Sequence, residues 1–240
     1  MPPFCLPKLP TVNPLQVEIM SDLDRLAQKW QQCFTDRFST CDLEHRVFEM
    51  LVAASTQPDR HYHNLNHIDR LLTTIDRTDT SLQNQTAVRL AVWFHDFVYD
   101  SQASDNEAQS AKFAEELLTN IGISSKLIDR VQQLVLATHG HQIDPDDPDR
   151  CIFLDADLAI LSADPVEYQA YTRSIRREYS WASDAAYKVG RVQVLQSFLQ
   201  RDRLYYSDLL SDELESIARF NLKQEIADYQ EYSDPKSDPW

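Results

Sequence analysis

The sequence predicts an all-α protein whose main part is a single domain of about ten helices. Three observations support this prediction. Apolar side chains recur at helical spacing along most of the chain, no stretch shows sustained period-two alternation, and only three glycines are available for tight turns. At 240 residues the chain can bury a substantial core. The predicted domain covers residues 15–229, after an extended leader at 1–14 and before a polar tail at 230–240.

Four helices are expected in the first hundred residues. Apolar positions at helical spacing predict helices over 15–34 and 42–55. A third helix is expected to open in the histidine-rich segment, capped by Asn64 or Asn66, and to include Ile75. The fourth is expected to begin at Ser81 and to run into the segment that contains His95 and Asp96.

Six more helices are expected in the rest of the chain. Ser104 and Glu107 have the spacing of a capping box, and Gly122 follows, so a helix is predicted between them. Helices should follow at 124–138, in the run LDADLAIL, at 165–179, at 183–201 and at 211–229. Gly190 lies inside the ninth helix, where glycine costs roughly 1 kcal/mol relative to alanine. Close packing against another helix is the expected reason for it.

Composition excludes several classes of function. The net charge of −15 disfavours non-specific binding to nucleic acid or to an anionic membrane. The chain has neither GxGxxG nor GxxxxGK[ST], which disfavours dinucleotide-binding and P-loop folds. No apolar run is long enough to span a bilayer, and the proline-broken N-terminus does not read as a secretory signal. Four scattered cysteines without a CxxC pair favour a reducing compartment, so a cytoplasmic location is expected.

Two histidine-containing segments and one acidic segment predict a metal site. AVWFHDFVYD places His95 and Asp96 in apolar surroundings, where an ionised carboxylate needs a partner. Upstream, His63 and His67 are four residues apart, so a helix would present them on one face. The run FLDADLAIL adds two acids among apolar residues.

Imidazole and carboxylate ligands together suit a divalent cation. The predicted ligand set therefore takes two imidazoles and two carboxylates from three segments: His67, His95, Asp96 and Asp157. A buried polar network without a metal is the alternative interpretation of these residues.

Further candidates lie downstream. His139 and His141 flank Gly140 at a predicted helix end, where an imidazolium would complement the helix dipole, but either could also lie near a phosphate. His141 is the better candidate for the second role. Arg176 and Arg177 are expected to form ordinary ion pairs, or else to offer one guanidinium fork that recognises phosphate.

The segments YHNLNH, WFHD and DADL resemble the HD-domain superfamily of metal-dependent phosphohydrolases, and most closely its bacterial branch of predicted HD phosphohydrolases. These motifs cover residues 62–158. The stretches REYSWASDAAYKVGRVQVLQSFLQR and ELESIARFNLKQE are also similar to that branch. YHNLNHIDRL is similar to the metal-binding stretch of cyclic-nucleotide phosphodiesterases, which share the helical HD architecture.

The resemblance implies roles for individual residues. His67 matches the first metal ligand, His95 and Asp96 match the central pair, and Asp157 fits the last ligand better than Asp155. His63 matches the histidine that protonates the leaving oxygen. Tyr99 stands where phosphodiesterases carry a further histidine, which leaves either Asp100 in the matching role or a weakly held second metal. Only the reaction class, and no cyclic-nucleotide specificity, is therefore implied.

The expected protein is a hydrolase that cleaves a phosphoester of a small molecule by metal-activated water, with a nucleotide as one candidate substrate. His63 and Asp96 are the catalytic candidates, and the substrate-binding candidates are His141, Arg176, Arg177 and Asp100. The metal would be Mn, Mg, Fe, Co or Ni. One alternative is a non-catalytic nucleotide-binding sensor. The other is an HD-type di-iron oxygenase, which needs two further histidines and finds only His139 and His141 conveniently placed.

Overall fold

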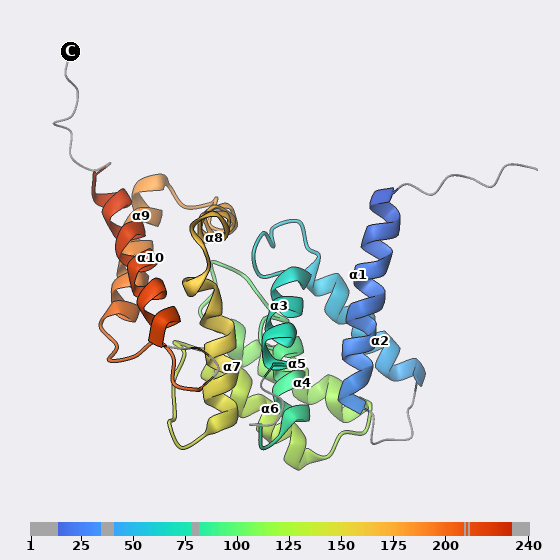
Figure 1. Cartoon of the computed structure of the whole chain (residues 1–240). Coiled ribbons are helices and arrows are strands. Elements are labelled where there is room, and N and C mark those ends of the chain that lie inside the picture. The colour runs from blue at the N-terminus through green and yellow to red at the C-terminus, as the bar shows by residue number, and fades with distance from the viewer. Residues whose placement is uncertain (1–13, 35–40, 78–81, 209, 211, 232–240) are drawn as a thin grey trace, which may run out of the picture. The chain divides into compact units, whose positions relative to one another are not determined.

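A computed structural model describes residues 14–34, 41–77, 82–208, 210 and 212–231. Within these ranges the chain forms ten α-helices and two 3-10 segments and contains no strand, which confirms the predicted all-α class (Figure 1). Nearly all of the expected leader and tail lies outside the described residues. The chain groups into two compact units, Met1–Phe38 and Ser39–Trp240. The domain limits expected at residues 15 and 229 stay a prediction.

The first unit contains α1 (Pro14–Gln31) and the 3-10 segment η1 (Gln32–Phe34), where the sequence predicts its first helix. The rings of Trp30 and Phe34 meet edge to face, with 4.8 Å between their centroids. Throughout the described part of the chain, helices fall short of the combination of length and apolar character that a membrane span requires.

The second unit is built around α4 (Gln85–Phe94), which has its most extensive contacts with four other helices. Residues 87–94 of α4 are all buried, because neighbours cover it on every side. This burial explains why residues 87–94, apart from Arg89, are apolar on every face of the helix rather than along one stripe. The neighbours are α3 (Leu65–Ile75), α5 (Asn106–Asn120), α6 (Ser125–Ala137) and α7 (Pro148–Leu158). The unit opens with α2 (Cys41–Ser55).

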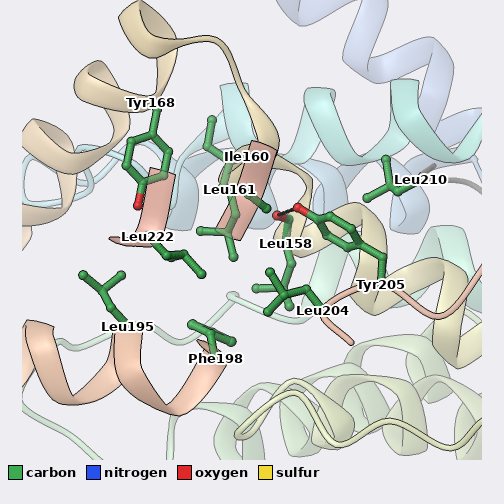
Figure 2. Packing of buried hydrophobic residues seen from close by; sticks show 11 residues of the cluster. Leu158, Ile160, Leu161, Tyr168, Leu195, Phe198, Leu204, Tyr205, Leu210 and Leu222 are labelled. Carbon is green, nitrogen blue, oxygen red and sulfur yellow. Dashed lines mark hydrogen bonds between the residues drawn. The ribbon is translucent and has the colours of Figure 1, made fainter. Parts of the chain in front are cut away.

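A second group of helices follows α7 through the 3-10 segment η3 (Ala159–Ser162), which contacts α8 (Pro165–Glu178) and α10 (Asp212–Glu231). Helix α9 (Asp184–Leu199) packs against α10. Figure 2 shows the apolar cluster that joins these elements, with Leu161, Leu195 and Leu222 turned toward one another. At its edge the Tyr205 hydroxyl donates to the Leu158 carbonyl at 3.1 Å. This cluster fixes η3 and α9 as two walls of the cavity described below.

Two helix starts differ from those predicted. Helix α4 begins at Gln85 and is capped by Asn84, whose side chain accepts from the Ala87 amide, whereas Ser81 lies outside the described residues. The capping box predicted from Ser104 and Glu107 is wrong, because α5 starts after Asp105 with no side-chain cap bond. Glu107 instead faces His139, with 3.3 Å between Oε2 and Nδ1.

Two histidines also lie at helix ends rather than within helices. Helix α4 stops at Phe94, so His95 is its C-cap and Asp96 follows it. Helix α3 begins after Asn64, one of the two predicted caps, so His63 precedes the helix instead of lying on the same helix as His67. The expected shared helix face is therefore wrong, although the rings of His63 and His67 still lie 5.7 Å apart.

Candidate metal centre

The four predicted ligands come from three elements that pack together. His67 lies in the first turn of α3, His95 and Asp96 lie at the end of α4, and Asp157 lies in the last turn of α7. Helices α3, α4 and α7 contact one another pairwise. This packing brings Nε2 of His67 to 3.2 Å from Nε2 of His95.

The spacing of the ligand atoms fits one shared cation. From Nε2 of His67 it is 3.2 Å to Oδ1 of Asp157 and 3.7 Å to Oδ2 of Asp96. From Nε2 of His95 it is 3.0 Å to Oδ2 of Asp96 and 3.8 Å to Oδ1 of Asp157. Adjacent donors on an ion bound at about 2.1 Å lie roughly 3.0–3.4 Å apart. The group His67, His95 and Asp157 could therefore hold a metal ion, and Asp96 lies within reach of the same point.

Unsatisfied polar atoms also favour a cation here. His67 and His95 are 3% and 2% exposed. Nδ1 of His95 lies 2.9 Å from the Val92 carbonyl, so a neutral ring donates there and turns the Nε2 lone pair toward the cluster. Oδ2 of Asp96 is buried and, among the described residues, accepts no hydrogen bond. A bound cation would satisfy both the lone pair and the carboxylate oxygen.

The carboxylates hold their charge despite burial. Burial alone would raise the pKa of Asp157, but hydrogen bonds from His141 and His67 hold that pKa well below its usual range. Burial likewise opposes charge on His95, yet the neighbouring Asp96 raises the pKa of that imidazole to about 9, and a cation bound at Nε2 would take the place of this proton. The centre is thus a place where positive charge is strongly favoured.

Asp155 has a different role from Asp157. It is fully buried, and its carboxylate accepts hydrogen bonds from the amides of Tyr206 (2.9 Å) and Ser207 (2.7 Å) and from the Ser207 hydroxyl (2.6 Å). Asp155 therefore fixes the chain before α10 and faces away from the histidines. This placement agrees with the preference for Asp157 as the last ligand.

Replacing Asp155 by asparagine is expected to lower the free energy of unfolding by about 1–3 kcal/mol, because one of its acceptor oxygens becomes a donor facing buried donors. Metal affinity should change little. The matched variant is Asp157→Asn on the same helix, which should lose metal affinity. Urea unfolding and metal titration of both proteins check this, and a folded Asp155→Asn protein that no longer binds metal would reverse the assignment.

The centre opens into a cavity of about 630 Å³. His63, His95, Asp96 and Asp157 are part of its lining. Beside them lies a residue that the sequence interpretation missed, Glu178 at the end of α8. Its Oε1 accepts hydrogen bonds from the amides of His61, Tyr62 and His63 at 2.8, 2.6 and 2.9 Å.

The other oxygen of Glu178 orients His63. Oε2 lies 2.7 Å from Nδ1 of His63 and accepts from the Tyr99 hydroxyl at 2.9 Å. With Nδ1 held by Glu178, the remaining nitrogen of His63 is Nε2, on a ring that lines the cavity. Burial alone would lower the pKa of His63, but Asp96 and Glu178 raise it. A charged imidazole next to the metal centre is the form that can donate a proton.

Arg60 is a second residue that the sequence interpretation missed. Its guanidinium is buried and donates to the carbonyls of Asp96 (2.6 Å), Phe97 (2.9 Å) and His63 (3.3 Å). Arg60 thereby ties the segment before α3 to the segment after α4. Hydrogen bonds from the Arg60 side chain to main-chain carbonyls thus hold the two histidine-containing segments together, independently of any metal.

The predicted arginine fork does not reach the cavity. Arg176 donates to the carbonyls of Tyr179 (2.7 Å) and Ala182 (3.1 Å) and pairs with Asp184, so it holds the α8–α9 connection. Arg177 is exposed. Neither arginine belongs to the cavity lining. The charged residue that is buried at the end of α8 is Glu178.

The other substrate-binding candidates do line the cavity. Asp100 is exposed at its rim, and its main chain exchanges two hydrogen bonds with the Asn106 side chain. Nε2 of His141 lies 3.1 Å from Oδ2 of Asp157, so this ring supports a predicted ligand. His139 lines the cavity as well and pairs with Glu107.

Comparisons of the chain with protein-family models, with curated proteins and with solved structures found no significant match. The similarity of its motifs to the HD superfamily therefore stays a prediction.

Proposed function

We propose that this protein is a metal-dependent phosphohydrolase that cleaves a phosphoester of a small molecule. One observation carries the proposal: His95, Asp96 and Asp157 of the proposed ligand set line the same cavity as His63, and Glu178 holds the His63 ring independently of them. His63 is a third histidine beside this set, and its raised pKa is a feature that functional sites often show.

His67, His95, Asp96 and Asp157 would hold the cation, and their mixed nitrogen and oxygen donors suit Mn, Fe, Co or Ni better than Mg. When bound, such an ion supplies Lewis acidity toward a phosphoryl oxygen and lowers the pKa of a nearby water. His141 keeps the Asp157 carboxylate in place through its 3.1 Å contact. His63 gives the proton at Nε2 to the departing alcohol oxygen, while Glu178 holds Nδ1 and stabilises the charged ring.

Replacing His63 by asparagine tests the proposal. We expect hydrolysis of an alkyl phosphate to fall roughly 10²–10⁴-fold, because its leaving oxygen needs a proton. Hydrolysis of p-nitrophenyl phosphate should fall much less, since nitrophenolate leaves without one. Metal content should stay unchanged, because His63 does not contact the ligand atoms. Equal losses for both esters would contradict the acid role, and a protein that hydrolyses neither ester with any of these metals would contradict the proposal itself.

The two alternatives make distinct predictions. A sensor would bind a nucleotide without turnover. A di-iron oxygenase would consume oxygen and would need His139 and His141 on a second ion, whereas Nδ1 of His139 pairs with Glu107 and Nε2 of His141 faces Asp157. Turnover measured with and without oxygen separates these classes from a hydrolase.

A further inference from the structure

Gly190 has no structural reason to be a glycine. It lies in the interior of α9, where glycine destabilises a helix relative to alanine. Gly122 and Gly140 have positive φ angles, but Gly190 does not. The close packing predicted from the sequence is wrong, because a Cβ atom at Gly190 would meet no neighbouring heavy atom within 4 Å. Neither backbone conformation nor packing therefore requires the missing side chain.

The open space at Gly190 belongs to the cavity. Gly190 lines it together with Tyr187, Arg191, Val194 and Phe198, which share one face of α9 at intervals of three and four residues. His63, His95, Asp96 and Asp157 belong to the same lining. Gly190 is exposed, so a side chain at position 190 would project into the open part of the cavity.

Much of the cavity lining is apolar and aromatic. Besides the residues of α9, it includes Ile160, Leu161, Tyr171, Ile175, Tyr179 and Trp181. Such a wall recognises an apolar body by burying its surface, and rings by packing against other rings.

Charged side chains in the cavity lining do not offer an alternative means of recognising a ligand. Arg191 is the only lysine or arginine among the described residues that line the cavity. Its Nε and Nη2 lie 2.8 and 3.1 Å from the two carboxylate oxygens of Glu225, so its charge is already neutralised. The lining also includes the acidic Asp100 and Glu107. Outside the metal centre, this surface therefore favours an uncharged part of a ligand.

We propose that Gly190 is a specificity-determining residue, and that the substrate is a phosphomonoester whose alcohol part is a bulky, apolar, ring-containing group accommodated against Gly190. This inference rests on the proposed function and narrows its substrate class. The phosphoryl group would lie at the metal end of the cavity, and the ring system would extend along α9.

Two esters with leaving groups of nearly equal acidity test the proposal: phenyl phosphate and 4-biphenylyl phosphate. Because the chemistry is matched, their kcat/KM ratio reports the contribution of the additional ring. We expect the metal-loaded protein to prefer the biphenylyl ester by about tenfold or more. Gly190→Leu should abolish that preference while keeping kcat/KM for phenyl phosphate within about threefold. Its Tm should not fall, because leucine favours the helix.

Val189→Leu is the matched control, because Val189 is exposed, is adjacent on α9 and does not line the cavity. It should leave the preference unchanged. Equal kcat/KM for the two esters in the unmodified protein would overturn the proposal. So would a Gly190→Leu protein that loses activity on both esters alike.

Failure of the proposed function is distinguishable from failure of this inference. If neither ester is hydrolysed, binding of the product 4-phenylphenol, measured by calorimetry, decides the matter. Binding that Gly190→Leu weakens at least about tenfold, and Val189→Leu does not, supports the apolar subsite independently of hydrolysis. Absence of binding to the unmodified protein overturns it.

Discussion

Replacing Asp96 by alanine is expected to lower kcat/KM by at least about 10³-fold and to remove most of the bound metal. The carboxylate oxygen Oδ2 of Asp96 is buried, accepts no hydrogen bond among the described residues and lies 3.0 Å from Nε2 of His95. Its removal takes a negatively charged donor out of the proposed ligand set. Loss of the several kcal/mol that a metal contributes to transition-state stabilisation corresponds to a rate loss of about this size.

Metal content and kcat/KM of the Asp96→Ala protein should be measured together with those of Asp129→Ala. Asp129 is an exposed acid on α6 outside the cavity lining, so its removal changes the net charge equally without touching the centre. The control should retain both metal and activity. A folded Asp96→Ala protein that keeps its metal would show that Asp96 is not a ligand.

Replacing Glu178 by glutamine is expected to produce the second largest effect, on stability and activity together. Oε1 could still accept from the three amides of residues 61–63, but an amide nitrogen in place of Oε2 would face two donors, Nδ1 of His63 and the Tyr99 hydroxyl. The His63 ring would lose the partner that orients it and stabilises its charge. Activity toward alkyl phosphates should fall, while metal content should not.

The stability effect of Glu178→Gln should depend on pH. Burial opposes ionisation of Glu178, but the contacts with His63 and the amides lower its pKa from 4.5 to about 2. That difference corresponds to roughly 3 kcal/mol of stability in the unmodified protein. Because the folded-state pKa is lowered, this stability is fully present above about pH 4.5 and is lost as the pH falls toward 2.

Urea unfolding at pH 7 and at pH 3 checks this expectation. The difference in free energy between the unmodified protein and Glu178→Gln should be smaller at pH 3. Glu167→Gln, an exposed acid on the same helix paired with Arg70 at 2.9 Å, should change stability by less than about 1 kcal/mol at either pH. A difference for Glu178→Gln that does not depend on pH would mean that the carboxylate charge contributes nothing.

Periodicity was sufficient to predict the helices but not where they end. The apolar run of α4 predicted a buried helix, and its residues 87–94 are buried on all sides. The end of α4 before Asp96 could not be predicted, because Arg60 takes up the carbonyls of Asp96 and Phe97 from another segment. Local sequence contains no signal for such a long-range hydrogen bond.

The ligand candidates were predictable because polar side chains in apolar runs are conspicuous. The residues that orient or support the ligand candidates could not be predicted. Glu178 lies 115 residues from His63 in sequence, and beside two arginines it is indistinguishable from a surface ion-pair partner. The same ambiguity left two interpretations of Arg176 open: it pairs with Asp184, as one of them expected, and also donates to the carbonyls of the following turn. Gly190 was assigned to close packing, because sequence alone does not reveal what surrounds a helix.

The proposed metal centre of His67, His95, Asp96 and Asp157 is tested most directly by calorimetric titration of chelator-treated protein with Mn²⁺. His67→Gln removes a buried predicted ligand, and His45→Gln removes an exposed histidine on α2 as a matched control. We expect saturable binding to the unmodified protein and to His45→Gln, together with a rise in Tm because the ion binds the folded state. Binding should be lost in His67→Gln. Absence of Mn²⁺, Fe²⁺, Co²⁺ and Ni²⁺ binding to the unmodified protein would contradict this metal centre. So would metal binding by His67→Gln equal to that of the unmodified protein.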